Sequence, residues 1–169
     1  MVVATVVLSE SNGASETVTD NIANLNMGSI DSPNVNYASN PIVAGTNSYE
    51  KWLRIKLVNI NNSNKIDNFQ IYMTPAPSIT GVSYLTNLKT APLNQNAYST
   101  PTNAVSSVAT LPMPTSDPGV ENIGVAGGSS GLSTANSYSD YFVMQVQTTA
   151  ASPPGDIPQK TIHVEYDEQ

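Results

Sequence analysis

The sequence predicts an all-β protein: a single antiparallel β-sandwich, Ig-like or jelly-roll, over residues 1–169, with seven to nine strands and long polar loops. Three observations lead to this prediction. The 12 prolines are spread along the chain and interrupt most helical windows. Valine, isoleucine, leucine and tyrosine gather in short runs that polar, turn-forming stretches separate. The run at 161–166 alternates strictly between apolar and polar residues, which is the period of a half-buried strand.

The first part of the chain predicts a strand followed mostly by loops. Residues 2–9 are rich in β-branched side chains and lack the basic segment and cleavage site of a signal peptide, so we expect a first strand there. Residues 11–20 have the composition of a loop, and 22–27 fit a short strand. Residues 31–46 contain two prolines and a glycine and are expected to be an ordered loop with extended pieces.

The middle of the chain contains the strongest internal strand, at residues 49–60. Its apolar residues Leu53, Ile55 and Leu57 share one side of the strand. A polar turn at 59–65 separates this strand from a second one at 66–73. Two strands joined by such a turn predict a β-hairpin with a longer loop. The other side of the first strand carries Trp52, Arg54, Lys56 and Val58.

The last part of the chain predicts a second hairpin. Residues 141–147 and 159–166 are expected to pair as antiparallel neighbours across the Pro153-Pro154-Gly155 turn. Further strands are expected at 81–88 and, more weakly, at 105–111 and 120–125, with loops at 92–103 and 127–139. The apolar positions of the clearest strands predict the core residues, which are Leu53, Ile55, Leu57, Phe69, Ile71, Val143, Val146, Ile162 and Val164.

The composition restricts the classes of function. Charged residues make up 11% of the chain, well below the usual quarter or so, and asparagine, serine and threonine fill about a third of all positions. The formal net charge of −7 disfavours binding to nucleic-acid phosphates. The chain has no cysteine for a disulfide or a thiolate metal site. No stretch reaches 18 apolar residues, so no transmembrane helix and no membrane partner are expected.

We predict no catalytic, cofactor-binding or metal-binding residue in this sequence. The single histidine, His163, falls on the polar side of its strand beside Glu165, and we interpret it as a surface residue. The glycine-rich run 127–131 lacks the following lysine and helix of a phosphate-binding loop. The loop aspartates show no calcium-binding spacing, and their expected role is turn capping. They are Asp20, Asp31, Asp67, Asp117, Asp140 and Asp156.

Several stretches taken together resemble a loosely defined, uncharacterised group of structural proteins of tailed bacteriophages. The likeness lies in the entry to a strand between Gly45 and Arg54 and in the terminal Tyr166-Asp167-Glu168 after a hairpin. Residues 7–13, 20–29, 66–69 and 140–147 contribute to it. The resemblance implies a virion β-sandwich with a structural role, located in the virion and assembled in the bacterial host cytoplasm. It does not specify the part of the virion.

The leading functional hypothesis is a capsid decoration (cement) protein that stabilises the phage head without catalysis or cofactor. Its expected partners are itself, as a homo-oligomer with a trimer favoured over a lattice-bound monomer, and the major capsid protein or other virion proteins. The loops 31–47, 92–103 and 127–139 are expected to become ordered on those partners, being long and neutral. The alternatives are a tail, neck or baseplate accessory protein, a carbohydrate-binding module using Trp52 or exposed tyrosines, and, least favoured, a glycan hydrolase.

Overall fold

The computed structural model describes residues 3–13, 15–88, 108–125 and 131–169, and its described secondary structure is entirely strand. This confirms the prediction of an all-β protein with antiparallel sheets. The predicted strand 105–111 overlaps an observed strand at Leu111 alone. Residues 105–107 and the predicted loop 92–103 lie outside the described residues. The eight strands are β1 (Thr5–Asn12), β2 (Thr17–Asp20), β3 (Lys51–Asn59), β4 (Ile66–Thr74), β5 (Val82–Thr86), β6 (Leu111–Pro112), β7 (Phe142–Thr148) and β8 (Thr161–Glu168).

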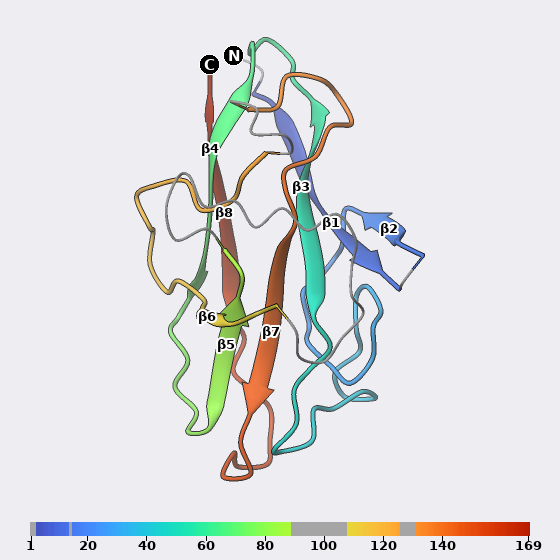
Figure 1. The fold of residues 1–169 in the computed structure, drawn as a ribbon, viewed down its shortest axis with the longest axis vertical. Helices are drawn as coiled ribbons and strands as arrows, with labels where there is room; N and C mark the ends of the chain where they lie inside the picture. Colours follow the sequence, from blue (N-terminus) through green and yellow to red (C-terminus); the bar gives the residue numbers. More distant parts are fainter. Residues whose placement is uncertain (1–2, 14, 89–107, 126–130) are drawn as a thin grey trace.

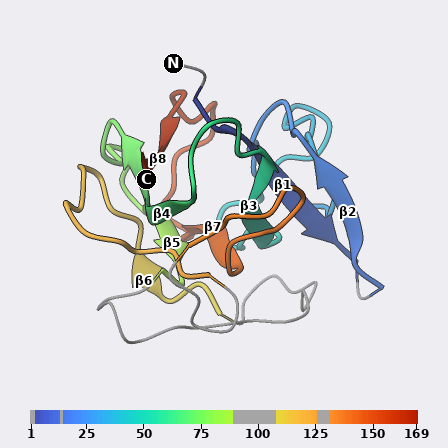
Figure 2. The same ribbon diagram turned by 90° about the horizontal axis from the view of Figure 1, so that it is seen from above.

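The strands form one large and one small antiparallel sheet. The large sheet has six strands in the order β2-β1-β3-β7-β5-β6, and the small sheet consists of β4 and β8. Strands β3, β5 and β7 run side by side along the long axis of the molecule (Figure 1). The view from above places β4 and β8 together on one side of the large sheet (Figure 2).

Both predicted hairpins are wrong in their pairing. Strand β3 pairs with β1 and β7, whereas β4 pairs with β8. Residues 141–147 and 159–166 therefore lie in different sheets, because β7 is hydrogen-bonded between β3 and β5. The physical reason is burial: β3 and β7 bury side chains on both faces and need a central position in a covered sheet. The connections 60–65 and 149–160 are long enough to cross from one sheet to the other.

Three smaller predictions are also corrected. Residues 11–20 are not a loop, because β1 extends to Asn12 and pairs with β2 from Ser9 opposite Asp20 to Asn12 opposite Thr17. Neither 22–27 nor 120–125 forms a strand, and only Val125 makes an isolated bridge, to Ser139. The β1–β2 hairpin was not predicted because the paired residues of both strands are mostly polar and show no alternation of apolar and polar side chains.

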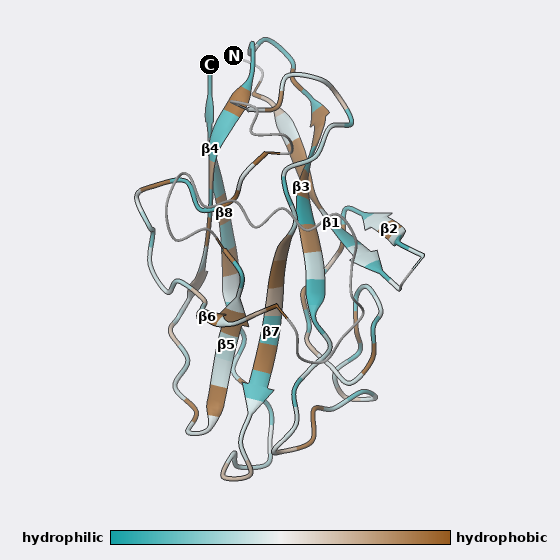
Figure 3. Ribbon diagram, in the orientation of Figure 1, coloured by the Kyte–Doolittle hydropathy of each residue, from teal (hydrophilic) through white to brown (hydrophobic). Residues whose placement is uncertain are grey.

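The main hydrophobic core lies between the two sheets. Leu53, Ile55 and Leu57 of β3 and Phe69 and Ile71 of β4 are buried in it, as predicted. Apolar bands on β3, β5 and β7 are visible in Figure 3. The prediction is also confirmed for Val143 and Val146. The two remaining predicted core residues, Ile162 and Val164, pack against this core but are only half-buried.

A second, smaller cluster covers the opposite face of the large sheet. Trp52 of β3 and Val143 of β7, which are opposite each other in the ladder, pack with Ala109 and Tyr141. The rings of Trp52 and Tyr141 meet edge to face with centroids 5.8 Å apart. The large sheet is thus covered on both faces around β3 and β7.

Ile55→Ala should lower the free energy of unfolding by about 2–5 kcal/mol, because Ile55 is buried in the main core and the truncation leaves a cavity. Val58→Ala on the same strand is the matched control, since Val58 is 40% exposed and should change stability by less than about 0.5 kcal/mol. Urea unfolding followed by circular dichroism measures both. Equal effects of the two substitutions would contradict the assigned faces of β3.

Candidate functional site

The single histidine belongs to a cross-strand cluster on the outer face of the small sheet. His163 lies opposite Tyr72 in the β4–β8 ladder, and the two rings stack with centroids 4.4 Å apart. Its Nε2 atom lies 2.7 Å from the Thr74 hydroxyl. The Tyr72 hydroxyl donates a 2.7 Å hydrogen bond to Glu165, and this bond raises the pKa of Tyr72. These contacts connect β4 to β8, as expected for cross-strand pairs.

The structure places the other sequence candidates apart from one another. Trp52 is 1% exposed, so the hypothesis that it recognises carbohydrate is wrong. The glycine-rich run 127–131 lies outside the described residues except for Gly131. The loop aspartates have separate roles: Asp117 accepts from the Gly119 amide, and Asp67 pairs with Lys65. Within the described ranges, no group of three or more histidine or acidic residues could hold a metal ion.

A polar cluster that the sequence did not reveal lies on the outer face of β3. The Arg54 guanidinium is held between two tyrosine rings, 4.2 Å from the centroid of Tyr138 and 4.3 Å from that of Tyr141. The chain at 136–139 runs beside β3, with the Ser139 amide donating to the Ile55 carbonyl and the Leu57 amide to the Ser137 carbonyl. This course brings the two tyrosines to either side of Arg54.

The hairpin β1–β2 supplies the acidic partners of this cluster. Glu16 pairs with Arg54 at 3.1 Å and also accepts the hydroxyl of Tyr141. Asp20 pairs with Lys56 at 2.5 Å. The hydrogen bond from Lys56, followed by one from Ser9, lowers the pKa of Asp20. Both cations and both carboxylates are thereby paired, and the cluster presents little net charge.

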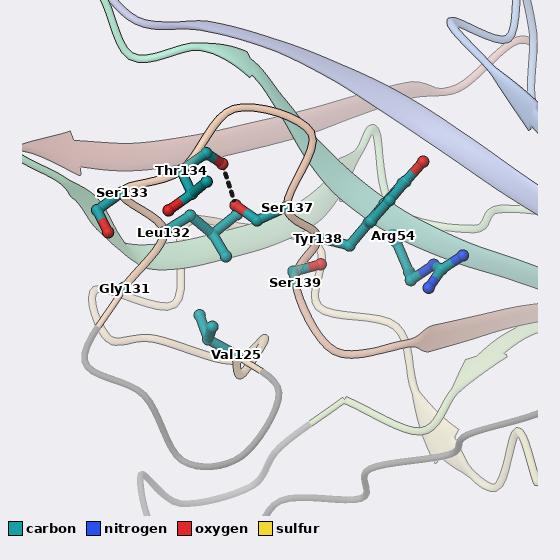
Figure 4. A pocket seen from close by; sticks show the side chains of 9 residues that line it. All are labelled: Arg54, Val125, Gly131, Leu132, Ser133, Thr134, Ser137, Tyr138 and Ser139. Carbon is teal, nitrogen blue, oxygen red and sulfur yellow. Dashed lines mark hydrogen bonds between the residues drawn. The ribbon is translucent and has the colours of Figure 1, made fainter.

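A pocket of about 450 Å³ opens beside Arg54 (Figure 4). Most of its wall is the polar stretch 131–139, with Val125 on the far side. Ser137 donates to the Thr134 carbonyl, and Ser139 accepts from the Ile55 amide, so these hydroxyls also hold the wall together. The Nε atom of Arg54 is buried and has no hydrogen-bond partner among the described residues. Hydroxyls beside an aromatic ring are suited to contacts with neutral polar groups.

A buried ion pair lies at one end of the main core. Lys51 and Glu10 are 2.8 Å apart, with side chains 4% and 1% exposed. Asn12 donates to Glu10 and to Asp31, and Lys51 donates to the Ser32 carbonyl. Burial raises the pKa of Glu10, and Lys51 opposes that shift. The two-residue period of β1, which places Glu10 on the same face as Leu8, is the sequence signal that could have revealed this pair.

The ion pair anchors a long neutral segment, residues 21–49, whose one charged residue is Asp31. Asp31 accepts from Asn12 and from the Gly13 amide, both at 2.7 Å, so its charge is used at the anchor. The segment also exposes large apolar side chains: Ile30 is 40% exposed, Tyr37 is 53% exposed and Val43 is 66% exposed.

This segment is held by hydrogen bonds within itself and to β7, where the Ser48 amide donates to the Val146 carbonyl. The Asn34 side chain accepts from the amides of Ala23 and Asn24, and the Ser29 amide donates to the Asn40 carbonyl. A Cβ atom at Gly28 would lie 2.6 Å from Val35 and 2.8 Å from the Asn40 carbonyl, so this close approach requires glycine. The asparagines of 31–47 thus supply hydrogen bonds within the chain that its composition did not predict, and contact of this loop with a partner stays a prediction.

No family model, curated protein or solved structure matches this chain. Among the described residues, no helix is long and apolar enough to cross a membrane.

Lys51→Met should destabilise the protein by about 3–5 kcal/mol at pH 7, because it leaves the Glu10 carboxylate buried without its cation. The double variant Glu10→Met/Lys51→Met should recover most of that loss, since no charge remains buried. Urea unfolding of the two variants measures the difference. A single variant as stable as the double one would show that the ion pair is not needed.

The stability of Lys51→Met should also depend on pH. Because burial raises the pKa of Glu10, folding favours its neutral form. The stability of the variant is therefore greatest below the ordinary value of 4.5 and falls as the pH rises through the raised pKa. Urea unfolding between about pH 4 and pH 8 tests this sign, with Glu10→Met/Lys51→Met as the control that lacks the titrating group.

Proposed function

We propose that this chain is a non-enzymatic virion structural protein, a capsid decoration protein that stabilises the head of a tailed bacteriophage. In this proposal the two antiparallel sheets form a β-sandwich that serves as a scaffold. Segment 21–49 is its contact surface for the capsid.

The observation that carries the proposal is the combination of order and neutrality in segment 21–49. Its hydrogen bonds are made within the segment and to β1 and β7 of the same chain, so little conformational entropy is lost when it binds. Its single charged residue, Asp31, is bound by the Gly13 amide at the end of β1. Ile30, Tyr37 and Val43 are exposed. Depletion of charge together with exposed aromatic and aliphatic side chains is typical of the centre of protein–protein interfaces.

Two further features support a structural role. The cations Arg54 and Lys56 are occupied by acidic and aromatic partners, which suits a supporting framework. The net charge of −7 would keep the protein away from packaged nucleic acid. The resemblance of several stretches to phage structural proteins points to the same class.

A carbohydrate-binding module is the second candidate, and the pocket beside Arg54 is the observation that favours it. Hydroxyls of the stretch 133–139 and the ring of Tyr138 line this pocket. Binding of glycans that Ser133→Ala and Ser137→Ala both weaken would support this candidate over the capsid role.

The first experiment is to measure the copy number and the thermal opening of purified particles. A decoration protein should be present in hundreds of copies or so, and particles without it should open at a lower temperature, because a ligand of the intact lattice stabilises it. Unchanged opening, or a few copies located at the tail, would contradict the proposal. The latter result would favour a tail, neck or baseplate accessory protein.

The second experiment tests the contact surface itself. Tyr37→Glu and Val43→Glu should each weaken rebinding to stripped particles at least about tenfold, since they place a charge in an apolar interface. Both side chains are exposed, so the melting temperature should stay unchanged. Val120→Glu, at a residue 56% exposed outside the segment, is the matched control and should rebind normally.

A further inference from the structure

Three of the four edges of the two sheets are protected against pairing with another strand. The large sheet ends in β2 and β6, which have four and two residues, and such short edge strands offer little to pair with. The outer edge of β4 is covered by other parts of the chain. Ile66 exchanges two hydrogen bonds with Leu132, the Met73 amide donates to Pro114, and the Ile123 amide donates to Phe69.

The free edge of β8 is the exception. This strand has eight residues, and its one ladder is with β4. Among the described residues, no backbone hydrogen bond runs along its other edge. Ile162, Val164 and Tyr166 pack against the core from β8, yet each is only half-buried. An edge of this length, with partly exposed apolar side chains, is a template for a further strand.

We propose that two copies of this chain associate through β8, as antiparallel neighbours about a twofold axis at Val164. The small sheets then join into one four-stranded sheet in the order β4-β8-β8-β4. On the core face, Ile162 lies opposite Tyr166 of the second copy. On the outer face, His163 lies opposite Glu165 of the second copy.

The order of side chains in β8 selects this register. It places Lys160, the residue before the strand, opposite Glu168 of the second copy, and it places the imidazole of His163, which can donate a hydrogen bond, opposite the carboxylate of Glu165. An axis at Glu165 would place two carboxylates directly opposite each other. An axis at Tyr166 would place Glu165 opposite Asp167, which repel in the same way.

The apolar residues agree with the register that the charges select. Every directly opposite pair shares one face of the ladder, so the axis at Val164 keeps Ile162, Val164 and Tyr166 of both copies on the core side. The proposed partner is therefore a second copy, because this edge is complementary to itself. This inference does not depend on the capsid role, and it gives a twofold dimer in place of the trimer expected from the sequence.

Substitutions of His163 and Glu165, which lie opposite each other across the proposed twofold axis, test the pairing of two β8 strands. The wild-type protein should sediment at twice its chain mass of 17.9 kDa at about 100 μM, a concentration at which a micromolar dimer is formed. His163→Glu creates two Glu–Glu contacts per dimer and should raise the dissociation constant at least about tenfold. Glu165→Lys should also weaken the dimer, and the double variant His163→Glu/Glu165→Lys should restore it.

The restoration separates pairing between copies from effects within one copy. The double variant removes the Tyr72–Glu165 hydrogen bond just as Glu165→Lys does, so recovery of the dimer relative to that single variant points to the charges that meet across the axis. Asp156→Lys is the matched control, since Asp156 is exposed in the turn before β8 and outside the ladder. A monomeric wild-type protein, or a double variant weaker than both single ones, would overturn the proposal.

A single cysteine tests the register, because the chain has none of its own. With the axis at Val164, Val164→Cys places two thiols on opposite Cα atoms about 4.5–5.5 Å apart, within disulfide range. Ile162→Cys is the control, since it faces Tyr166 of the second copy and its two thiols lie too far apart. Oxidation should cross-link Val164→Cys alone. Cross-linking of Ile162→Cys, or of neither variant, would overturn the register.

Discussion

The requirement that β3 be covered on both faces determines the arrangement of the other elements. One face sends Leu53, Ile55 and Leu57 into the core between the sheets. The other carries Trp52 into the second cluster and Arg54 into its tyrosine pair. A strand of this kind needs hydrogen-bonded neighbours on both sides, which are β1 and β7. The amphipathic strands β4 and β8 can then close the core from a separate, smaller sheet.

The few charges of this protein are used mainly inside its own framework. Glu10 and Lys51 anchor segment 21–49 at the end of the core, while Glu16 and Asp20 fix the cations on β3. A buried pair contributes little net stability but makes wrong arrangements costly. The consequence is a surface segment with a defined shape and almost no charge. Asparagine side chains, which can replace backbone partners in turns, make that order possible without apolar burial.

The sequence predicts which side chains of a strand are buried, but it does not predict which strands pair with one another. The alternation in 66–73 identified Phe69 and Ile71 correctly, because the face of a strand depends on adjacent residues alone. The partner of a strand depends on distant residues, and the apolar runs of β4 and β7 fit β8 equally well. The cluster around Arg54 shows the same limit. Its tyrosines lie more than 80 residues away along the chain, and only the course of 136–139 beside β3 brings them together.

The unequal sizes of the two sheets connect the two proposals. A two-stranded sheet covers the core only partly, so β8 keeps both a free edge and half-buried apolar residues. Pairing through β8 would complete that layer and leave segment 21–49 unoccupied in each copy, because the segment is held by β1, β3 and β7 of the large sheet. Each dimer would then carry two contact surfaces. On a repeating lattice the second contact becomes intramolecular, so modest affinity in each segment would suffice for stable attachment.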